Sequence, residues 1–233
     1  MAHPYFHSIS SAHRWGGCAE DYLPLHSWFD DSKQLVCDLR HRAIRHHTEG
    51  IAFAIRVFGE TITNCDGCVV STAALGERHV TEDLGMVPSA AAWFNKLDPS
   101  LRLKYTRVST PQQSAASARK WGGVPEDYDL VHRFLDEQFA DVQREHIVRH
   151  HSYGIFDCES VFGPVIANSV GREIPVRVIA EQHVKAEFGV VTSTATILEK
   201  LQPESWMLRV AKPSRVILED TGEDHCEAPA IRK

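Results

Sequence analysis

Apolar residues occur in short blocks that predict helices, and each block returns about a hundred residues later in the chain. Two almost continuously apolar segments end in Phe-Gly at Gly59 and Gly163, which predicts buried helices that are each stopped by a glycine cap. The residues that follow, 61–70 and 165–176, combine short apolar runs with central turn residues, a pattern typical of a β-hairpin. The predicted fold class is therefore mainly α with a small β-hairpin in each repeat, an α+β arrangement.

The polar residues repeat together with the apolar ones. Residues 40–47 read RHRAIRHH, and residues 144–151 read REHIVRHH. Matches continue on both sides at a nearly fixed offset, so the chain consists of two tandem copies of one domain, which we expect to form an intramolecular pseudo-dimer. The predicted boundaries are 1–98 for repeat 1, 99–113 for a linker, 114–211 for repeat 2 and 212–233 for an irregular tail.

Two pairs of histidine and carboxylate stand four residues apart in repeat 1. His26 is followed by Asp30, and His79 is followed by Asp83. On a helix this spacing places both side chains on one face, where they can bind one ion or share a hydrogen bond. Both pairs return in repeat 2, the second with glutamate in place of aspartate, as His132 with Asp136 and His183 with Glu187.

The doubled histidines are predicted to lie on a central helix. Because consecutive residues on a helix point about 100 degrees apart, at most one histidine of each pair can be a direct ligand. The other histidine then orients a ligand or packs in the core.

Together these residues predict a divalent metal site in each repeat. Imidazoles and carboxylates without thiolates suit zinc, iron, manganese or nickel. The candidate metal ligands are His26, Asp30, His46, His47, His79, Asp83, His132, Asp136, His150, His151, His183 and Glu187. No individual catalytic residue is assigned.

Such an ion can lower the pKa of bound water and supply the nucleophile of a hydrolase. Nearby cationic side chains can bind a small anionic substrate, such as a phosphoester or a nucleotide-like molecule. The candidates for this role are Lys33, Arg40, Arg45, Arg144 and Arg149. Whether the protein is an enzyme stays open, because the same residues can form a buried polar network or a binding pocket in a ligand-binding or protein-interaction module.

The cysteines do not predict a second metal site. Cys65 and Cys68 have the spacing of half a zinc knuckle, but no second pair with this spacing follows, and Asp66-Gly67 between them indicates a hairpin turn.

The overall charge narrows the classes of partner. A net charge of -6 argues against general binding to nucleic acid or to anionic membranes, and no apolar stretch approaches membrane-spanning length. A cytoplasmic, soluble protein is expected, with further homo-oligomerisation left open.

The motifs resemble a short, uncharacterised, histidine-rich domain of bacterial and phage proteins. They are Trp-Gly-Gly with Glu-Asp-Tyr, His26 with Asp30 and Ser32-Lys33, Arg-His-Arg with His46-His47, Phe-Gly, and His79-Val80 with Asp83-Leu84-Gly85. The order of these residues is also similar to that in small helical domains of the His-Asp phosphohydrolase type. The first resemblance implies no activity, although it is compatible with an accessory protein of a phage or mobile element. The second resemblance implies phosphoester hydrolysis.

Overall fold

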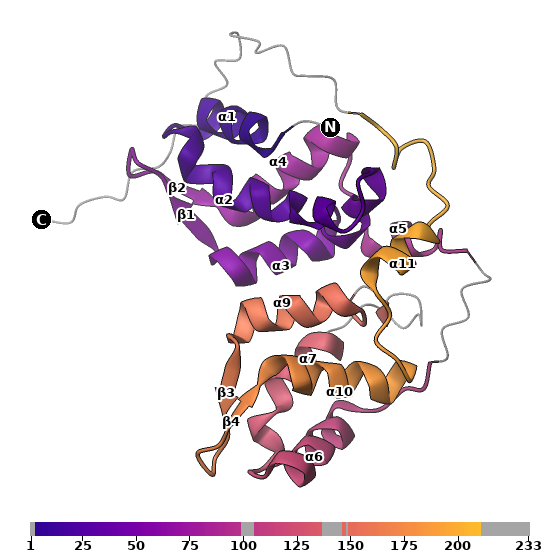
Figure 1. Ribbon diagram of the computed structural model, residues 1–233. Helices are drawn as coiled ribbons and strands as arrows, with labels where there is room; N and C mark the ends of the chain where they lie inside the picture. The colour runs from indigo at the N-terminus through magenta and orange to yellow at the C-terminus, as the bar shows by residue number, and fades with distance from the viewer. Residues whose placement is uncertain (1–2, 99–104, 137–145, 148, 211–233) are drawn as a thin grey trace, which may run out of the picture. The chain divides into compact units, whose positions relative to one another are not determined.

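Two units, each built of helices and one small hairpin, make up the described part of the chain. The computed structural model describes residues 3–98, 105–136, 146–147 and 149–210 (Figure 1). Unit 1 contains Met1–Trp93 with Pro203–Lys233, and unit 2 contains Phe94–Gln202. The predicted fold class, mainly α with an antiparallel hairpin in each repeat, is confirmed.

Unit 1 begins with two helices that pack side by side and continues through two short 3-10 helices into α3, a hairpin and α4. These elements are α1 (Pro4–Trp15), α2 (Ala19–Asp30), η1 (Asp31–Gln34), η2 (Leu39–Ile44), α3 (Thr48–Phe58), β1 (Thr61–Thr63), β2 (Val69–Ser71) and α4 (Thr72–Leu84). The short α5 (Ala90–Phe94) stands at the division between the units. In the hairpin Ile62 pairs with Val70, and the buried Val70 faces the core.

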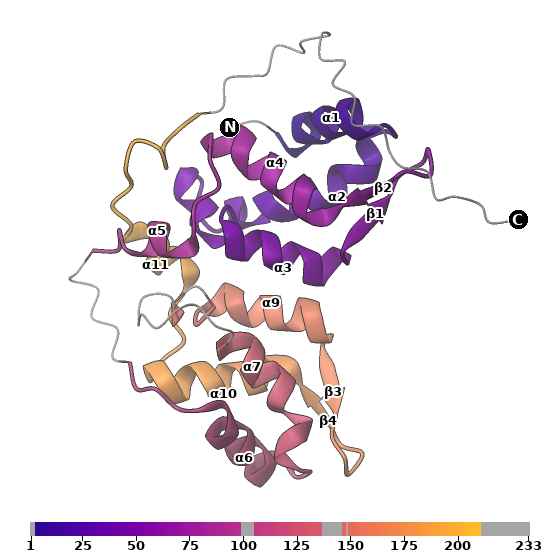
Figure 2. The ribbon, with the colours of Figure 1, turned by 180° about the vertical axis from the view of Figure 1, so that it is seen from behind.

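Unit 2 repeats this order, as the view from behind also shows (Figure 2). Its elements are α6 (Thr110–Trp121), η3 (Pro125–Asp127), α7 (Asp129–Asp136), α9 (Ser152–Phe162), β3 (Val165–Ala167), β4 (Glu173–Pro175), α10 (Val176–Phe188) and α11 (Thr194–Glu199). Helix α6 has the bounds of α1 shifted by 106 residues, whereas α9 and α10 have those of α3 and α4 shifted by 104. The two units are therefore the same fold, and repeat 2 is shorter only between α7 and α9.

The glycine pair after the first helix is fixed by a buried tyrosine. The backbone of Gly16 has a φ of 76°, which favours glycine, and its carbonyl accepts a hydrogen bond from the Tyr22 hydroxyl at 2.9 Å. Asn64, at the hairpin, donates to the same hydroxyl at 2.9 Å. Unit 2 repeats both contacts through Tyr128 and Asn168. These bonds tie the hairpin to the first two helices and fix where α4 and α10 begin.

The stretch around the doubled histidines differs from the predicted central helix. In unit 1, residues 39–44 form the 3-10 helix η2, and a turn at 45–47 separates it from α3. Arg45 is in this turn, and its guanidinium donates to the carbonyl of Trp28 and lies over the Trp28 ring. The turn lets His46 and His47 point to different partners, which a continuous helix would not allow so freely.

The structure also differs from the expected linker. Helix α6 begins at Thr110, inside the stretch 99–113, with Pro111 in its first turn, where the missing N–H of proline costs nothing. Residues 99–104 of this stretch, and the tail from 212, lie outside the described residues. Residues from Pro203 group with unit 1, where the Trp206 ring packs at 5.0 Å from that of Trp93.

Within unit 2, equivalent positions of the two repeats pair with each other. Leu97 and Leu201 form an antiparallel bridge, flanked by hydrogen bonds of 2.8 Å from Asp98 to Lys200 and from Gln202 to Lys96. Among the residues described, no helix is long and apolar enough to cross a membrane.

We expect Gly50→Ala to destabilise unit 1 strongly, although Gly50 is in a helix where alanine is normally favoured. A Cβ at this position would collide with the carbonyl oxygen of Arg45, and Gly154 meets Arg149 in the same way. Urea unfolding should show a loss of about 2 kcal/mol or more, as for other overpacked sites. Ala52→Ser, at an exposed position of α3, is the control and should change stability little. Equal stability of the Gly50 variant would contradict the close approach.

Candidate metal centre

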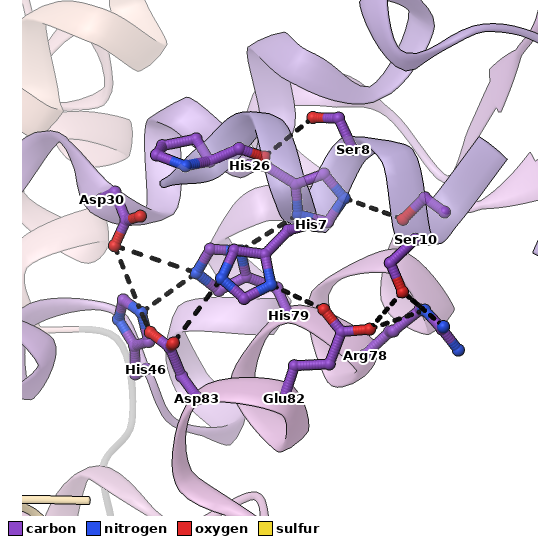
Figure 3. A network of polar contacts seen from close by, with 12 residues as sticks. His7, Ser8, Ser10, His26, Asp30, His46, Arg78, His79, Glu82 and Asp83 are labelled. Atoms are coloured by element: carbon purple, nitrogen blue, oxygen red, sulfur yellow. Dashed lines mark hydrogen bonds and ion pairs between the residues drawn. The ribbon is translucent and has the colours of Figure 1, made fainter. Parts of the chain in front are cut away.

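Four buried side chains converge in unit 1 and are named cluster 1 (Figure 3). Asp30 ends α2, His46 is in the turn before α3, and His79 and Asp83 are one turn apart on α4. Each offers one ligand atom, and all four atoms lie within 4.8 Å of one another. None of the four residues is more than 4% exposed.

The separations within cluster 1 fit ligands of a common ion. The Nε2 atoms of His46 and His79 are 3.0 Å apart, and Oδ2 of Asp83 lies 3.2 Å from Nε2 of His46. Oδ1 of Asp30 is 3.7 Å from the first nitrogen and 4.0 Å from the second, and it accepts no hydrogen bond from the described residues. Metal–ligand distances of about 2.1 Å give separations of about 3.0 to 3.4 Å between neighbouring ligands and about 4.2 Å between opposite ones.

His26 is placed behind His79. Its Nδ1 lies 3.0 Å from Nδ1 of His79, and its Nε2 lies 2.9 Å from the hydroxyl of Ser11. Burial, with the nearby charge of His7, lowers the pKa of His26 to about 3, so its ring is neutral at pH 7. Nδ1 of His26 can then accept a hydrogen bond from Nδ1–H of His79, which leaves Nε2 of His79 as a lone pair that faces the cluster.

The same chain occurs in unit 2. His132 lies 3.0 Å from His183 through the two Nδ1 atoms and 2.9 Å from the Ser117 hydroxyl. Burial lowers the pKa of His132 to about 3 as well. Because serine, outer histidine and inner histidine recur with the same atoms and distances, the chain is a property of the domain and not of one copy.

Three cationic groups stand beside the carboxylates of cluster 1. The ammonium of Lys33 is 2.6 Å from Oδ2 of Asp30, and the guanidinium of Arg42 is 2.8 Å from Oδ2 of Asp83. His7 contacts Glu82 at 2.6 Å and Asp83 at 3.5 Å. Burial alone would lower the pKa of His7, but hydrogen bonds with these two carboxylates and their negative charges outweigh it and raise the pKa to about 9.

Asp83 is the residue on which these contacts converge. Burial raises the pKa of its carboxyl group, but hydrogen bonds with His46 and His7 and the adjacent positive charges bring the pKa well below its usual range. The group is therefore a carboxylate, acceptor only, at any ordinary pH.

A corresponding group in unit 2 is named cluster 2 and contains Asp136, His146, His150 and Glu187. Their ligand atoms also lie within 4.8 Å of one another. His150 Nε2 is 3.1 Å from Oε2 of Glu187 and 3.0 Å from Nε2 of His183, which in turn is 3.3 Å from Oδ1 of Asp136. His183 is thus a fifth donor at the edge of cluster 2.

The second histidine of each doubled pair caps a helix. His47 accepts a hydrogen bond at Nδ1 from the backbone N–H of Gly50 at 3.0 Å and donates from Nε2 to the carbonyl of Ile44. His151 accepts from the N–H of Gly154 at 3.2 Å. Both are N-caps, of α3 and α9, and the structure places neither in a cluster.

The arginines predicted to bind an anion make other contacts. Arg149 donates to the carbonyl of Phe134 at 2.6 Å and lies over the Phe134 ring, as Arg45 does at Trp28. Arg40 pairs with Asp38 at 2.6 Å, whereas Arg144 is outside the described residues. Among the predicted cations that the structure describes, Lys33 alone contacts a cluster residue.

Sequence reasoning missed four residues that the structure brings to the clusters: His7, Arg42, Tyr105 and His146. Arg42 and His146 occupy equivalent positions, because the offset between the repeats is 104 residues in this region. A comparison of the two copies for positions where an arginine is replaced by a possible metal ligand would have found them. Tyr105 is in the predicted linker, and its ring lies 5.3 Å from that of His146. Only the folded chain brings it there.

A third group of possible ligands, Cys18, Asp21 and Cys65, has a structural explanation. The carboxylate of Asp21 accepts from the N–H groups of Cys18 and Cys65. Asp127 makes the same two bonds in unit 2, where valine and serine replace the cysteines. The aspartate therefore fixes a loop with or without thiols.

These features define a class: tandem copies of a small helical domain, each with a buried cluster of histidine and carboxylate. The chain belongs to the family described as "Domain of unknown function (DUF6915)", whose model matches residues 2–103 and again 109–207. The double match confirms the tandem duplication of an uncharacterised domain, and it supplies no link to phosphohydrolases. No curated protein and no solved structure matches the chain.

We expect His47→Ala to destabilise unit 1 by about 1 kcal/mol or more, because the first turn of α3 loses its cap. His47→Asn retains a side-chain acceptor and should recover part of this loss. Urea unfolding of the two variants against the unchanged protein measures both effects. Equal stability of all three proteins would show that the cap contributes nothing.

Proposed function

We propose that this protein binds a divalent transition-metal ion through the histidine and carboxylate cluster of its duplicated domain. One observation carries the proposal: three equivalent positions in two diverged repeats bring two carboxylates and one imidazole together, and a second imidazole completes each group within 4.8 Å, from His79 in unit 1 and from His146 in unit 2. Chance convergence of such groups in one copy is easy, but retention in both copies, with aspartate exchanged for glutamate, indicates a chemical requirement.

The donor set limits which ion fits. Imidazole nitrogen and carboxylate oxygen without thiolate suit zinc, iron, manganese or nickel, in contrast with closed structural zinc sites, which usually use cysteine. The buried outer histidines fit the same role. His26 and His132 hold the inner rings of His79 and His183 in place, and each can accept a hydrogen bond from the Nδ1–H that the inner ring directs away from the ion.

Metal-dependent hydrolysis is the second candidate function, and it is favoured by the exposure of cluster 2. The side chain of Asp136 is 20% exposed, compared with 3% for Asp30, and His146 is also only half-buried. A bound ion supplies a water of lowered pKa as nucleophile. A phosphoester or another small anionic substrate would have to reach the ion from this side, where the exposed Arg107 offers a positive charge.

The metal content of purified, untagged protein tests the proposal. Plasma mass spectrometry should find bound metal in the unchanged protein and little in the double variant His79→Ala, His183→Ala, because an inner ligand is then missing from both clusters. Circular dichroism should show that this variant keeps its helices. The double variant His47→Ala, His151→Ala is the matched control, since it removes the adjacent, capping histidines and should retain the metal.

Two outcomes would count against metal binding. Protein that holds no metal after incubation with zinc, manganese and iron(II) under reducing conditions would leave a closed polar network or a non-catalytic interaction module as the explanation. Equal loss of metal in the capping variant would show that the ion is not bound at the two clusters.

The hydrolase hypothesis needs its own measurement. Metal-loaded protein should release product from a panel of phosphomonoesters, phosphodiesters and nucleotides, and chelation should abolish that release. Metal-loaded protein that is inactive on the whole panel would limit the function to metal binding.

A further inference from the structure

The two clusters share their donors but differ in their charge balance. In cluster 1, Lys33 pairs with Asp30 and Arg42 pairs with Asp83, so each carboxylate has a cation of the chain's own. In cluster 2, no lysine or arginine of the described residues is within ion-pair distance of Asp136 or Glu187. Buried carboxylates are costly unless a cation or a metal compensates them.

One position accounts for much of this difference. Arg42 is fully buried, and besides Asp83 it binds the carbonyl of Arg209 at 2.7 Å, so its charge is fixed beside cluster 1. Its equivalent in unit 2 is His146, a member of cluster 2. A guanidinium has no lone pair for a metal and repels a cation, whereas an imidazole can be a ligand.

Lys33 has no equivalent for a different reason. Repeat 2 is two residues shorter after Asp136 than repeat 1 is after Asp30, and the Ser-Lys pair of η1 is absent from it. Asp136 instead accepts a hydrogen bond from the hydroxyl of Thr110 at 2.5 Å. A neutral donor leaves the negative charge of Asp136 in place.

The hydrogen bonds of the cluster histidines also differ between the two units. In cluster 2, Nδ1 of His150 lies 2.5 Å from the carbonyl of His146 and must donate to it. Its Nε2 lies 3.1 Å from Oε2 of Glu187, which can only accept. This second contact needs a positive charge, either a second proton on the ring or a metal ion between the two atoms.

Cluster 1 resolves the same contact without an ion. Nδ1 of His46 has no hydrogen-bond partner among the residues described, so nothing holds the proton on that nitrogen. The proton can be on Nε2, which then donates across 3.2 Å to Oδ2 of Asp83. The two carboxylates of cluster 1 are thus held by ion pairs with Lys33 and Arg42 and by a hydrogen bond from His46.

An unpartnered hydroxyl adds an independent observation at cluster 2. The Tyr105 oxygen is buried and has no hydrogen-bond partner among the described residues. The Tyr105 ring lies 5.3 Å from that of His146, so the hydroxyl belongs to the surroundings of cluster 2. A donor without a partner beside a set of acceptors is suited to a water or anion bound to an ion there.

We propose that the metal ion is bound in unit 2, by Asp136, His146, His150 and Glu187 with His183 beside them, and that cluster 1 is a metal-free copy in which Arg42 and Lys33 take the place of the ion. This inference rests on the proposed metal binding and assigns it to one copy. The more diverged repeat is the one that binds the ion, and the repeat with the fuller set of motifs is its structural partner.

An isosteric pair of variants tests the assignment. Glu187→Gln and Asp83→Asn each exchange one oxygen for an amide group at equivalent positions. Titration with cobalt(II), followed by its visible absorption, should give a single site in the unchanged protein. We expect Glu187→Gln to weaken binding by about tenfold or more, whereas Asp83→Asn should leave the affinity unchanged.

Exchange of the distinguishing residue gives a second, independent test. His146→Arg copies unit 1 into unit 2 and should abolish cobalt binding. Arg42→His with Lys33→Met copies the ligand and removes the cations in unit 1, so a second cobalt site should appear. Circular dichroism shows whether each variant is folded. If His146→Arg does not fold, Glu187→Gln tests cluster 2 in its place. If the variant of Arg42 and Lys33 does not fold, Asp83→Asn tests cluster 1 in its place.

The outcomes separate this inference from the metal binding on which it rests. Two cobalt ions per unchanged chain, or a loss of binding in Asp83→Asn but not in Glu187→Gln, would overturn the assignment to unit 2 and leave metal binding intact. No cobalt binding by the unchanged protein would overturn both.

Discussion

Each repeat buries one carboxylate among histidines at the end of its long fourth helix, and the structure depends on how the negative charge of that group is compensated. Asp83 on α4 and Glu187 on α10 are almost fully buried, and a carboxylate in such surroundings must be paired, hydrogen-bonded or bound to a metal. In unit 1 the partners are a guanidinium and two imidazoles. In unit 2 Glu187 contacts His150 and accepts a hydrogen bond from the backbone N–H of Val108, and no lysine or arginine of the described residues is within ion-pair distance of it. That contrast underlies the proposed position of the ion.

The rest of the fold fixes the positions of the helices that carry these groups. The Tyr22 hydroxyl ties the glycine loop after α1 to the hairpin before α4, and so fixes the height of α4 against α2. The cap at His47 fixes where α3 begins, which leaves His46 in the preceding turn, free to face α4. Because unit 2 repeats both devices, the clusters have kept their backbone frame while the side chains around them have changed.

Duplication explains how such changes became possible. With two copies of one cluster in a chain, one copy can lose its ion provided that other charges stabilise its carboxylates. Two differences between the repeats fit such a loss. Arg42 of repeat 1 corresponds to His146 of repeat 2, and Lys33 is present in repeat 1 only. Retention of the serine and histidine chain in both units indicates that it serves the fold, with or without an ion in the cluster.

The sequence by itself determined the duplication, the fold class, and the placing of His79 and Asp83 on one face of a helix, because these depend on periodicity along one chain. The expectation that only one histidine of each pair reaches the cluster rested on a continuous helix, which the structure replaces with a turn. That His46 joins the cluster while His47 caps α3 depended on this turn, since local spacing cannot show where a helix begins when a side chain caps it. The place of His26 behind His79, the approach of Tyr105 and the charge difference at Arg42 and His146 were decided only by the tertiary structure. Each of these arises from contacts between segments far apart in the chain, whose distances and desolvation no local pattern encodes.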